Sequence, residues 1–191
     1  MIGAEAPPTA RQLRRLFFAL WPDDATREAL RRSTSDVLRH CGGKPVRLES
    51  VHITLAFLGN VPGEQFDAVV GAARRVASEP LTLILDRFGY FPAPQVLWLG
   101  PAQAPGGLRV LTRDLRAAVA AAGVAPDPKP FHPHLTLARK VRTEPKLTPP
   151  KPVEWAVGGF VLVESETDPE GARYTVVASF PVGGASAPTL S

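Results

Sequence analysis

Cysteine is almost missing from this chain, which has one, Cys41, among its 191 residues. A single cysteine excludes a disulfide bond within the chain and fits a reducing compartment, so we expect a cytoplasmic protein. Long apolar runs are missing too, since none approaches the roughly 18–20 residues of a membrane-spanning helix. The apolar patch at 16–21 is shorter than the core of a signal peptide and leads directly into Pro22. It therefore predicts a strand and no export.

Cofactor-binding motifs are also scarce. Gly106-Gly107 opens a predicted helix but lacks the lysine and the spacing of a phosphate-binding loop. His132 and His134 have the spacing of two transition-metal ligands, yet no cluster of Asp, Glu or Cys stands nearby to complete a site. We therefore expect no metal and no cofactor, and we interpret His132 as a packing residue or a support for its neighbour.

What remains is the composition of an ordinary globular protein, 45% hydrophobic and 21% charged. The length suits one domain or two closely packed lobes. Small and polar residues with proline occupy 1–12 and 183–191, which predicts flexible tails around one folded domain at 13–182. The net charge of +4 favours anionic partners such as nucleic acid or phosphorylated small molecules, although the excess is modest.

The order of predicted elements repeats. Hydrophobic spacing, glycine and proline predict helices and strands in alternation. The expected helices cover 24–39, 63–78 and 106–122, and the expected strands cover 14–21, 48–58, 81–91, 96–100, 134–139, 157–164 and 173–180. A strand–helix–strand unit thus occurs at 14–58 and again at 96–139. We expect an α+β fold of two similar lobes.

The repeat carries a shared motif, H-x-T-L. The chain has four histidines, and two of them begin this pattern, at 52–55 (HITL) and at 134–137 (HLTL), 82 residues apart. In a strand, residues two apart point to the same face, so each motif presents one imidazole and one hydroxyl while its other two side chains enter the core. Two lobes that face each other would bring both motifs to a shared cleft.

This combination favours chemistry at phosphorus. Histidine titrates near neutral pH, so one copy suits a general base and the other a general acid. Threonine hydroxyls are good donors to anionic oxygens. Arg139 follows the second motif and could hold a phosphate with two parallel hydrogen bonds. A single H-x-T-L means little, because a lone strand histidine is more often structural; the matched second copy favours function. Tryptophans and phenylalanines are expected in the core, unless one stacks on a base.

The doubled motif resembles the two-histidine phosphoesterase superfamily, and the surrounding sequence resembles one branch of it. That branch is the RNA 2′,3′-cyclic phosphodiesterases, historically called 2′-5′ RNA ligases. The resemblance is carried by RLFFALWP at 15–22, LESVHITLAFLGNV at 48–61, FHPHLTLAR at 131–139 and FVLVESETDPEGARYTV at 160–176. These stretches are spread over nearly the whole chain between the predicted tails.

The resemblance implies a bilobal, pseudo-symmetric α+β fold, with an antiparallel sheet in each lobe, helices outside and the H-x-T-L strands along a central cleft. It implies that His52 and His134 are the catalytic pair, that Thr54 and Thr136 donate to phosphate oxygens, and that Arg139 is a further anion contact. The implied reaction is metal-free hydrolysis of a terminal RNA 2′,3′-cyclic phosphate to a 2′-phosphomonoester. The implied substrates are tRNA fragments or short RNAs, and we expect a monomer that does not bind membranes.

Several alternatives keep the same residues. Related enzymes act on small cyclic phosphates of the ADP-ribose type, or join tRNA halves through a 2′-5′ linkage by the reverse of hydrolysis. A protein that binds RNA ends without turnover would use the same hydroxyls and Arg139, although a binder needs no matched acid and base. A purely structural repeat is the weakest alternative. Which histidine is the acid and which the base stays open.

Overall fold

The computed structural model describes residues 12–168 and 171–181. The predicted tails therefore lie, apart from Gln12, outside the described residues. Two short 3₁₀ turns, at Leu48–Ser50 and Gly63–Gln65, accompany three helices and ten strands in the described ranges. In chain order these are β1 (Leu13–Leu20), α1 (Asp24–His40), β2 (Lys44–Pro45), β3 (Ile53–Pro62), α2 (Phe66–Arg74), β4 (Leu81–Leu85), β5 (Arg87–Phe91), β6 (Val96–Gly100), α3 (Gly106–Ala121), β7 (Leu135–Arg139), β8 (Val153–Val157), β9 (Gly159–Asp168) and β10 (Gly171–Pro181).

The main sheet joins both repeats. Its strand order is β10-β9-β1-β3-β7-β6-β5, β2 pairs with β7 as an eighth strand, and all neighbours are antiparallel. A separate two-stranded sheet pairs β4 with β8. The repeated units meet where β3 pairs with β7, through Ile53 and Leu135. The predicted α+β class is confirmed, and the strands of the two halves are continuous with one another in a single sheet.

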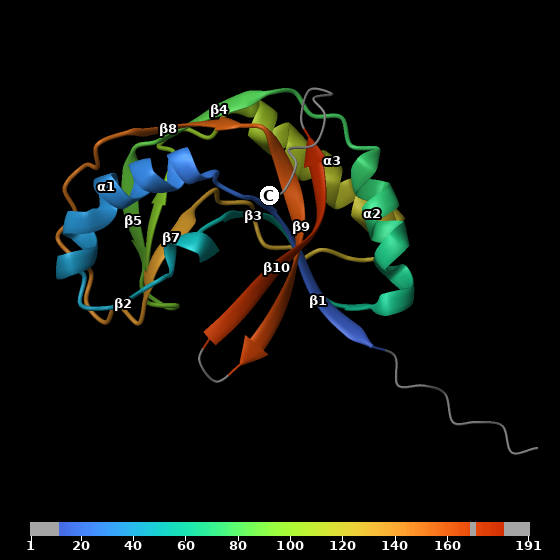
Figure 1. The fold of residues 1–191 in the computed structure, drawn as a ribbon, viewed down its shortest axis with the longest axis horizontal. Coiled ribbons are helices and arrows are strands. Elements are labelled where there is room, and N and C mark those ends of the chain that lie inside the picture. The colour runs from blue at the N-terminus through green and yellow to red at the C-terminus, as the bar shows by residue number, and fades with distance from the viewer. Residues whose placement is uncertain (1–11, 169–170, 182–191) are drawn as a thin grey trace, which may run out of the picture.

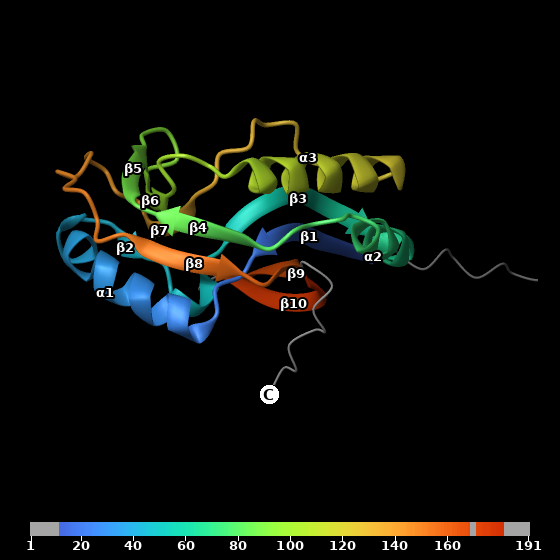
Figure 2. The same ribbon diagram turned by 90° about the horizontal axis from the view of Figure 1, so that it is seen from above.

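The two long helices, α1 and α3, each pack away from the strand that precedes them in sequence. α1 follows β1 in sequence but packs against β7 and β8, whereas α3 follows β6 but packs against β3 and α2. Figure 1 shows α1 on the side of β5 and β7, and α3 beside α2 on the other side. Figure 2 shows the same separation from above. This packing ties the two halves together, because each helix buries its apolar stripe against strands of the other repeat.

Capping and spacing explain where the helices lie. The side chain of Asp23 accepts a hydrogen bond from the backbone of Thr26 at 2.7 Å and so starts α1. Four apolar residues of α3 lie on its buried face, at the spacing predicted from sequence: Leu108, Leu111, Leu115 and Val119. Gly123 follows α3 with a φ of +89°, the left-handed conformation expected just past a helix end. No helix in residues 12–168 or 171–181 has the length and apolar character needed to cross a membrane.

The sheet has apolar residues on both faces. Along β1, Leu16, Phe18 and Leu20 enter the main core, which the helices cover. The alternate residues Phe17 and Ala19 point to the opposite face and form a smaller cluster with Val163. Several aromatic side chains border this smaller cluster, and they include Trp21, Phe57 and Tyr174. The second face is therefore aromatic, and it is the face on which the first motif histidine is found.

Some predicted elements differ from the structure. The expected strand 48–58 begins at Ile53, after a 3₁₀ turn, and continues to Pro62. The expected strand 81–91 is two strands in different sheets, interrupted at Asp86, whose carboxylate accepts from the backbone of Ala102 at 2.7 Å. The first of the two final expected strands, 157–164, is preceded by a further strand, β8, which ends at Val157.

Candidate active site

The two motif histidines occupy equivalent places. Each stands one residue before its strand, since β3 begins at Ile53 and β7 at Leu135. Ile53 and Leu135 are fully buried, while both histidines and both motif threonines are partly exposed. The predicted alternation within each motif, polar toward the solvent face and apolar toward the core, is therefore confirmed.

A β-bulge follows the threonine of the second motif. Thr136 and Ala138 lie opposite consecutive residues of β6, so Leu137 between them has no partner in the ladder. A bulge shifts the alternation of side chains by one residue. Arg139 is consequently on the same face as Thr136, although it is three residues further along the strand.

The first motif has the same bulge. Thr54 and Ala56 lie opposite consecutive residues of β1, which leaves Leu55 as the extra residue. Both copies therefore share the longer pattern H-x-T-L-A with the leucine bulged. The residue that corresponds to Arg139 is Phe57, which borders the aromatic cluster on the solvent face. The two halves of the site are thus alike in their histidines and threonines and differ at this position, where one side is cationic and the other aromatic.

Each catalytic candidate is held in one tautomer by the backbone. The Nδ1 atom of His52 lies 2.7 Å from the carbonyl oxygen of Ser50, and the Nδ1 atom of His134 lies 2.7 Å from that of His132. A carbonyl can only accept, so Nδ1 of each ring carries the proton. The lone pair of the neutral imidazole is then on Nε2, the atom left for exchange of protons with a substrate.

Burial lowers the pKa of both imidazoles. The pKa of His52 falls to about 4, mainly through burial, while the bond to Ser50 opposes the shift and the charges of Arg139 and His134 add to it. The pKa of His134 is also lowered, mainly by burial and further by the charges of His132 and Arg139. Both rings are therefore neutral near pH 7 in the protein alone. An anionic phosphate between them would stabilise the imidazolium and supply the acid form.

The charge of Arg139 contributes to both pKa shifts. It acts on His52 and on His134, which come from opposite halves of the sheet, and in both cases its effect is smaller than that of burial.

Aromatic side chains fix the histidine rings. His52 is stacked on Trp21, with centroids 5.3 Å apart and planes 8° apart, and also contacts Phe17 and Tyr174. His134 meets the edge of Phe91 at 5.1 Å. These contacts, with the backbone hydrogen bonds, restrain each ring without placing a charged partner on it. Of the three tryptophans, Trp155 and Trp98 are buried, and Trp21 is at the site.

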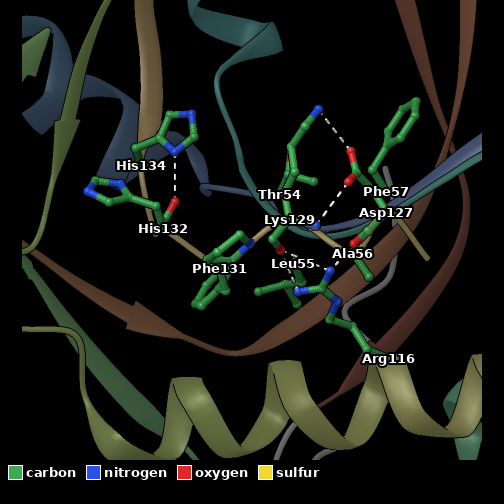
Figure 3. Close-up of a pocket in the computed structure, with 11 residues that line it drawn as sticks. Thr54, Leu55, Ala56, Phe57, Arg116, Asp127, Lys129, Phe131, His132 and His134 are labelled. Carbon is green, nitrogen blue, oxygen red and sulfur yellow. Dashed lines mark hydrogen bonds and ion pairs between the residues drawn. The ribbon is translucent and has the colours of Figure 1, made fainter. Parts of the chain in front are cut away.

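A cavity of about 250 Å³ lies between the motifs (Figure 3). Its lining includes Thr54 of the first motif and His134 of the second, together with His132. Thr54 of the first motif and His134 of the second therefore line the same cavity. His52, Thr136 and Arg139 are not among its lining residues, so their part in the site stays a prediction.

The loop before the second motif contributes residues that sequence reasoning missed. Arg116 of α3 donates to the backbone carbonyls of Asp127 and Lys129, and the backbone amide of Asp127 donates to the carbonyl of Phe57 at 2.8 Å. Asp127 also pairs with Lys129 at 3.2 Å. This loop bridges α3 and β3 and closes one side of the cavity (Figure 3). In the sequence, the sign of an ordered loop is the proline at every second position from 126 to 130.

Nothing in the described ranges resembles a metal centre. Residues 12–168 and 171–181 contain no group of three or more His, Cys, Asp or Glu side chains placed to hold an ion. The ring of His132 packs against Trp98 at 4.9 Å and Phe91 at 5.4 Å, and its carbonyl supports His134. His132 is therefore the packing and supporting residue that the sequence suggested.

Comparisons with known proteins find similar sequences over most of this chain. Residues 19–169 match the sequence profile of the 2′-5′ RNA ligase superfamily. A protein of Thermus thermophilus named RNA 2′,3′-cyclic phosphodiesterase is 38% identical, over 89% of this chain and 91% of its own length. One of Escherichia coli with the same name is 37% identical, over 84% and 92%.

Solved structures are also similar to this chain, in fold as well as in sequence. The apo form of E. coli LigT matches with a TM-score of 0.82 and 34% identity, over 90% of this chain and 98% of that one. LigT has also been crystallised with 3′-AMP, and that structure matches equally well. The T. thermophilus protein TT0787 has a TM-score of 0.76 at 37% identity, over 89% and 98%.

Proposed function

Because the chain belongs to the 2′-5′ RNA ligase superfamily, we propose that it hydrolyses the 2′,3′-cyclic phosphate at the end of an RNA to a 2′-phosphomonoester. The observation that carries the proposal is the matched pair His52 and His134. Each imidazole is neutral, is held by a carbonyl at Nδ1 and comes from its own half of one sheet. The structural likeness to a LigT complex with 3′-AMP supports a nucleotide as the ligand of this cleft.

The chemistry follows from two proton transfers. One imidazole accepts a proton from water through Nε2 while the water oxygen bonds to phosphorus. The bond from phosphorus to the 3′ oxygen breaks, and the other histidine, as imidazolium, protonates that oxygen. The phosphate stays on the 2′ oxygen. Each proton transfer contributes roughly 10²–10⁴-fold to the rate.

Three further side chains would bind the phosphate. The hydroxyls of Thr54 and Thr136 come from the same motifs and are partly exposed, so they are suited to donate to the two non-bridging oxygens. Arg139 supplies a positive charge, which stabilises the extra negative charge of the transition state. None of these steps requires a metal ion.

The same pair can carry out ligation. If the 5′-hydroxyl of a second RNA replaces water as the nucleophile, the same bond to the 3′ oxygen breaks and a 2′-5′ linkage results. Its reversal exchanges the roles of acid and base. Hydrolysis and 2′-5′ ligation therefore share one site, and the concentrations of water and RNA ends decide between them.

Partners and location follow from the same features. The net charge of +4 supports RNA, such as a tRNA fragment or a short single strand, as the partner. One chain supplies both motifs, which supports a monomer as the active form. Cys41, the single cysteine, is buried and forms no disulfide, which fits a cytoplasmic protein.

The test is hydrolysis of a short RNA that ends in a 2′,3′-cyclic phosphate, with a chelator present. Chromatography separates the 2′-phosphate product from the 3′-phosphate. We expect the 2′-phosphate alone. If the RNA binds but is not turned over, the protein is a reader of RNA ends. If RNA is inert but a cyclic phosphate of the ADP-ribose type is opened, the reaction stands and the substrate is a small nucleotide.

A further inference from the structure

A second cavity adjoins the one between the motifs. It has a volume of about 430 Å³ and is lined by Arg109, Thr112, Arg113, Arg116 and Phe131. Arg116 and Phe131 line both cavities, so the two hollows meet at these side chains. Figure 3 shows Phe131 between the second-motif histidine and the helix that carries Arg116. The path from the reacting centre therefore continues along α3.

The second cavity is strongly cationic. Its three arginines are spaced four and three residues apart, which places them along one face of α3 over about 10 Å of helix. Its lining includes no carboxylate. Arg109 is exposed, and its side chain makes no hydrogen bond or ion pair within the described part of the chain. Arg113 pairs with Asp114 at 2.7 Å, but its side chain is 71% exposed.

The floor of this cavity holds a polar group without a partner. The hydroxyl of Thr112 is buried and makes no hydrogen bond among the described residues. Thr34 of α1 shows the usual arrangement, in which the hydroxyl donates to the carbonyl four residues earlier, here that of Leu30 at 2.9 Å. Thr112 departs from that arrangement beneath the arginines, where the oxygen of an anionic ligand would satisfy it.

Arg116 differs from Arg109 and Arg113 in the groups that its side chain binds. Its guanidinium is occupied by the carbonyls of Asp127 and Lys129, so it holds the loop that lines the first cavity. Arg109 and Arg113 remain to contact a ligand, and the half-buried ring of Phe131 provides a flat surface beside them. Guanidinium groups that can each grip a phosphate, next to an aromatic ring, suit single-stranded nucleic acid.

We propose that the second cavity is a subsite for single-stranded RNA on the 5′ side of the reacting nucleotide. Arg109 and Arg113 bind backbone phosphates of the RNA, and Phe131 stacks on a base between those phosphates and the reacting end. This inference rests on the proposed function, since it assumes that the reacting phosphate lies between His52 and His134. A mononucleotide fills only the first cavity, so the subsite favours an RNA of several nucleotides over a small cyclic nucleotide.

The test compares two substrates and two double variants. The substrates are a nucleoside 2′,3′-cyclic monophosphate and an eight-nucleotide single-stranded RNA with a 2′,3′-cyclic end. The variants are Arg109→Ala/Arg113→Ala, in the subsite, and Arg32→Ala/Arg39→Ala, on the exposed face of α1. Both remove two positive charges from a helix, and alanine favours helix formation. The value of kcat/KM is measured for each substrate between 50 and 200 mM salt.

We expect the ratio of kcat/KM for the RNA to that for the mononucleotide to fall about tenfold in the subsite variant and to stay constant in the control variant. The slope of log kcat/KM against log salt for the RNA should become shallower by roughly 1.4, about 0.7 for each lost phosphate contact. Equal ratios in both variants would overturn the subsite. So would a wild-type protein that uses both substrates equally well. If the wild type turns over neither substrate, it is the proposed function that fails.

Discussion

Ile53 of β3 lies directly opposite Leu135 of β7, and they are the only residue pair that joins the two strands. They also occupy the same position in the two motifs, between the histidine and the threonine. An antiparallel pair relates its strands by a local twofold axis, so this contact places the two histidines symmetrically about one centre. The pairing of Ile53 with Leu135 therefore sets where the two histidines lie. Four predictions concern the residues around them.

The histidine pair should be essential for turnover. Replacing His52 or His134 with Ala removes one proton transfer, so kcat for a 2′,3′-cyclic phosphate should fall by at least ~10²-fold. The double variant should lose much less than the product of the two single losses, because the residues act as a unit. Steady-state kinetics measures both effects. His40→Ala, at the exposed end of α1, is the matched control, and a comparable loss in that variant would contradict the assignment.

The charge of Arg139 should lower the pKa of both imidazoles. Its positive charge disfavours imidazolium in His52 and His134, so Arg139→Gln should raise both pKa values. The shift can be followed by NMR titration of the ring protons. Lys140→Gln removes a neighbouring charge that does not contribute to either shift and should leave the titrations in place. Titration curves that are the same with and without Arg139 would place its side chain outside the cleft.

Acid should destabilise the protein through His52. Its pKa is about 4 in the folded chain and about 6.5 when unfolded. Between these values the unfolded chain binds a proton that the folded chain does not, so the free energy of unfolding falls as the pH is lowered from 6.5 to 4. The loss amounts to at most about 3 kcal/mol. His52→Gln should remove this part of the pH dependence in urea titrations, whereas His40→Gln should retain it. A wild type whose stability is constant over this range would contradict the prediction.

Arg116 should stabilise the loop at 125–130. Because its guanidinium donates to the carbonyls of Asp127 and Lys129, Arg116→Ala should lower the free energy of unfolding by about 1.5–3 kcal/mol. The backbone amide of Asp127, which donates to the carbonyl of Phe57, should also exchange its hydrogen with solvent faster. Arg113→Ala, which removes an exposed ion pair, should leave the free energy of unfolding nearly unchanged. Equal stabilities for these two variants would show that the carbonyl contacts contribute little.

Much of this protein can be read from local sequence because the relevant forces act over a few residues. Asp23 caps α1 with its own side chain, and the apolar spacing from Leu108 to Val119 determines which face of α3 is buried. Alternation in H-x-T-L decides that the histidine and threonine face away from the core. The doubling of that motif was enough to predict a pair of catalytic residues, and the family resemblance supplied the reaction.

Other features were decided by contacts between distant residues. Arg139 stands three residues after Thr136, so alternation alone would place it on the opposite face; the bulge at Leu137, visible against β6, puts it on the same face as Thr136. The expected strand at 81–91 is divided because its two parts find different partners, β8 and β6.

By itself, the sequence determined the local elements, the chemistry of the site and its twofold repetition, because capping, alternation and residue type act within a few positions. The tertiary structure decided which strands pair, where α1 and α3 pack, and that Arg116 and Phe131 line two adjoining cavities. These depend on pairing and packing between segments far apart in the chain, and no local pattern encodes which distant partner a segment will meet.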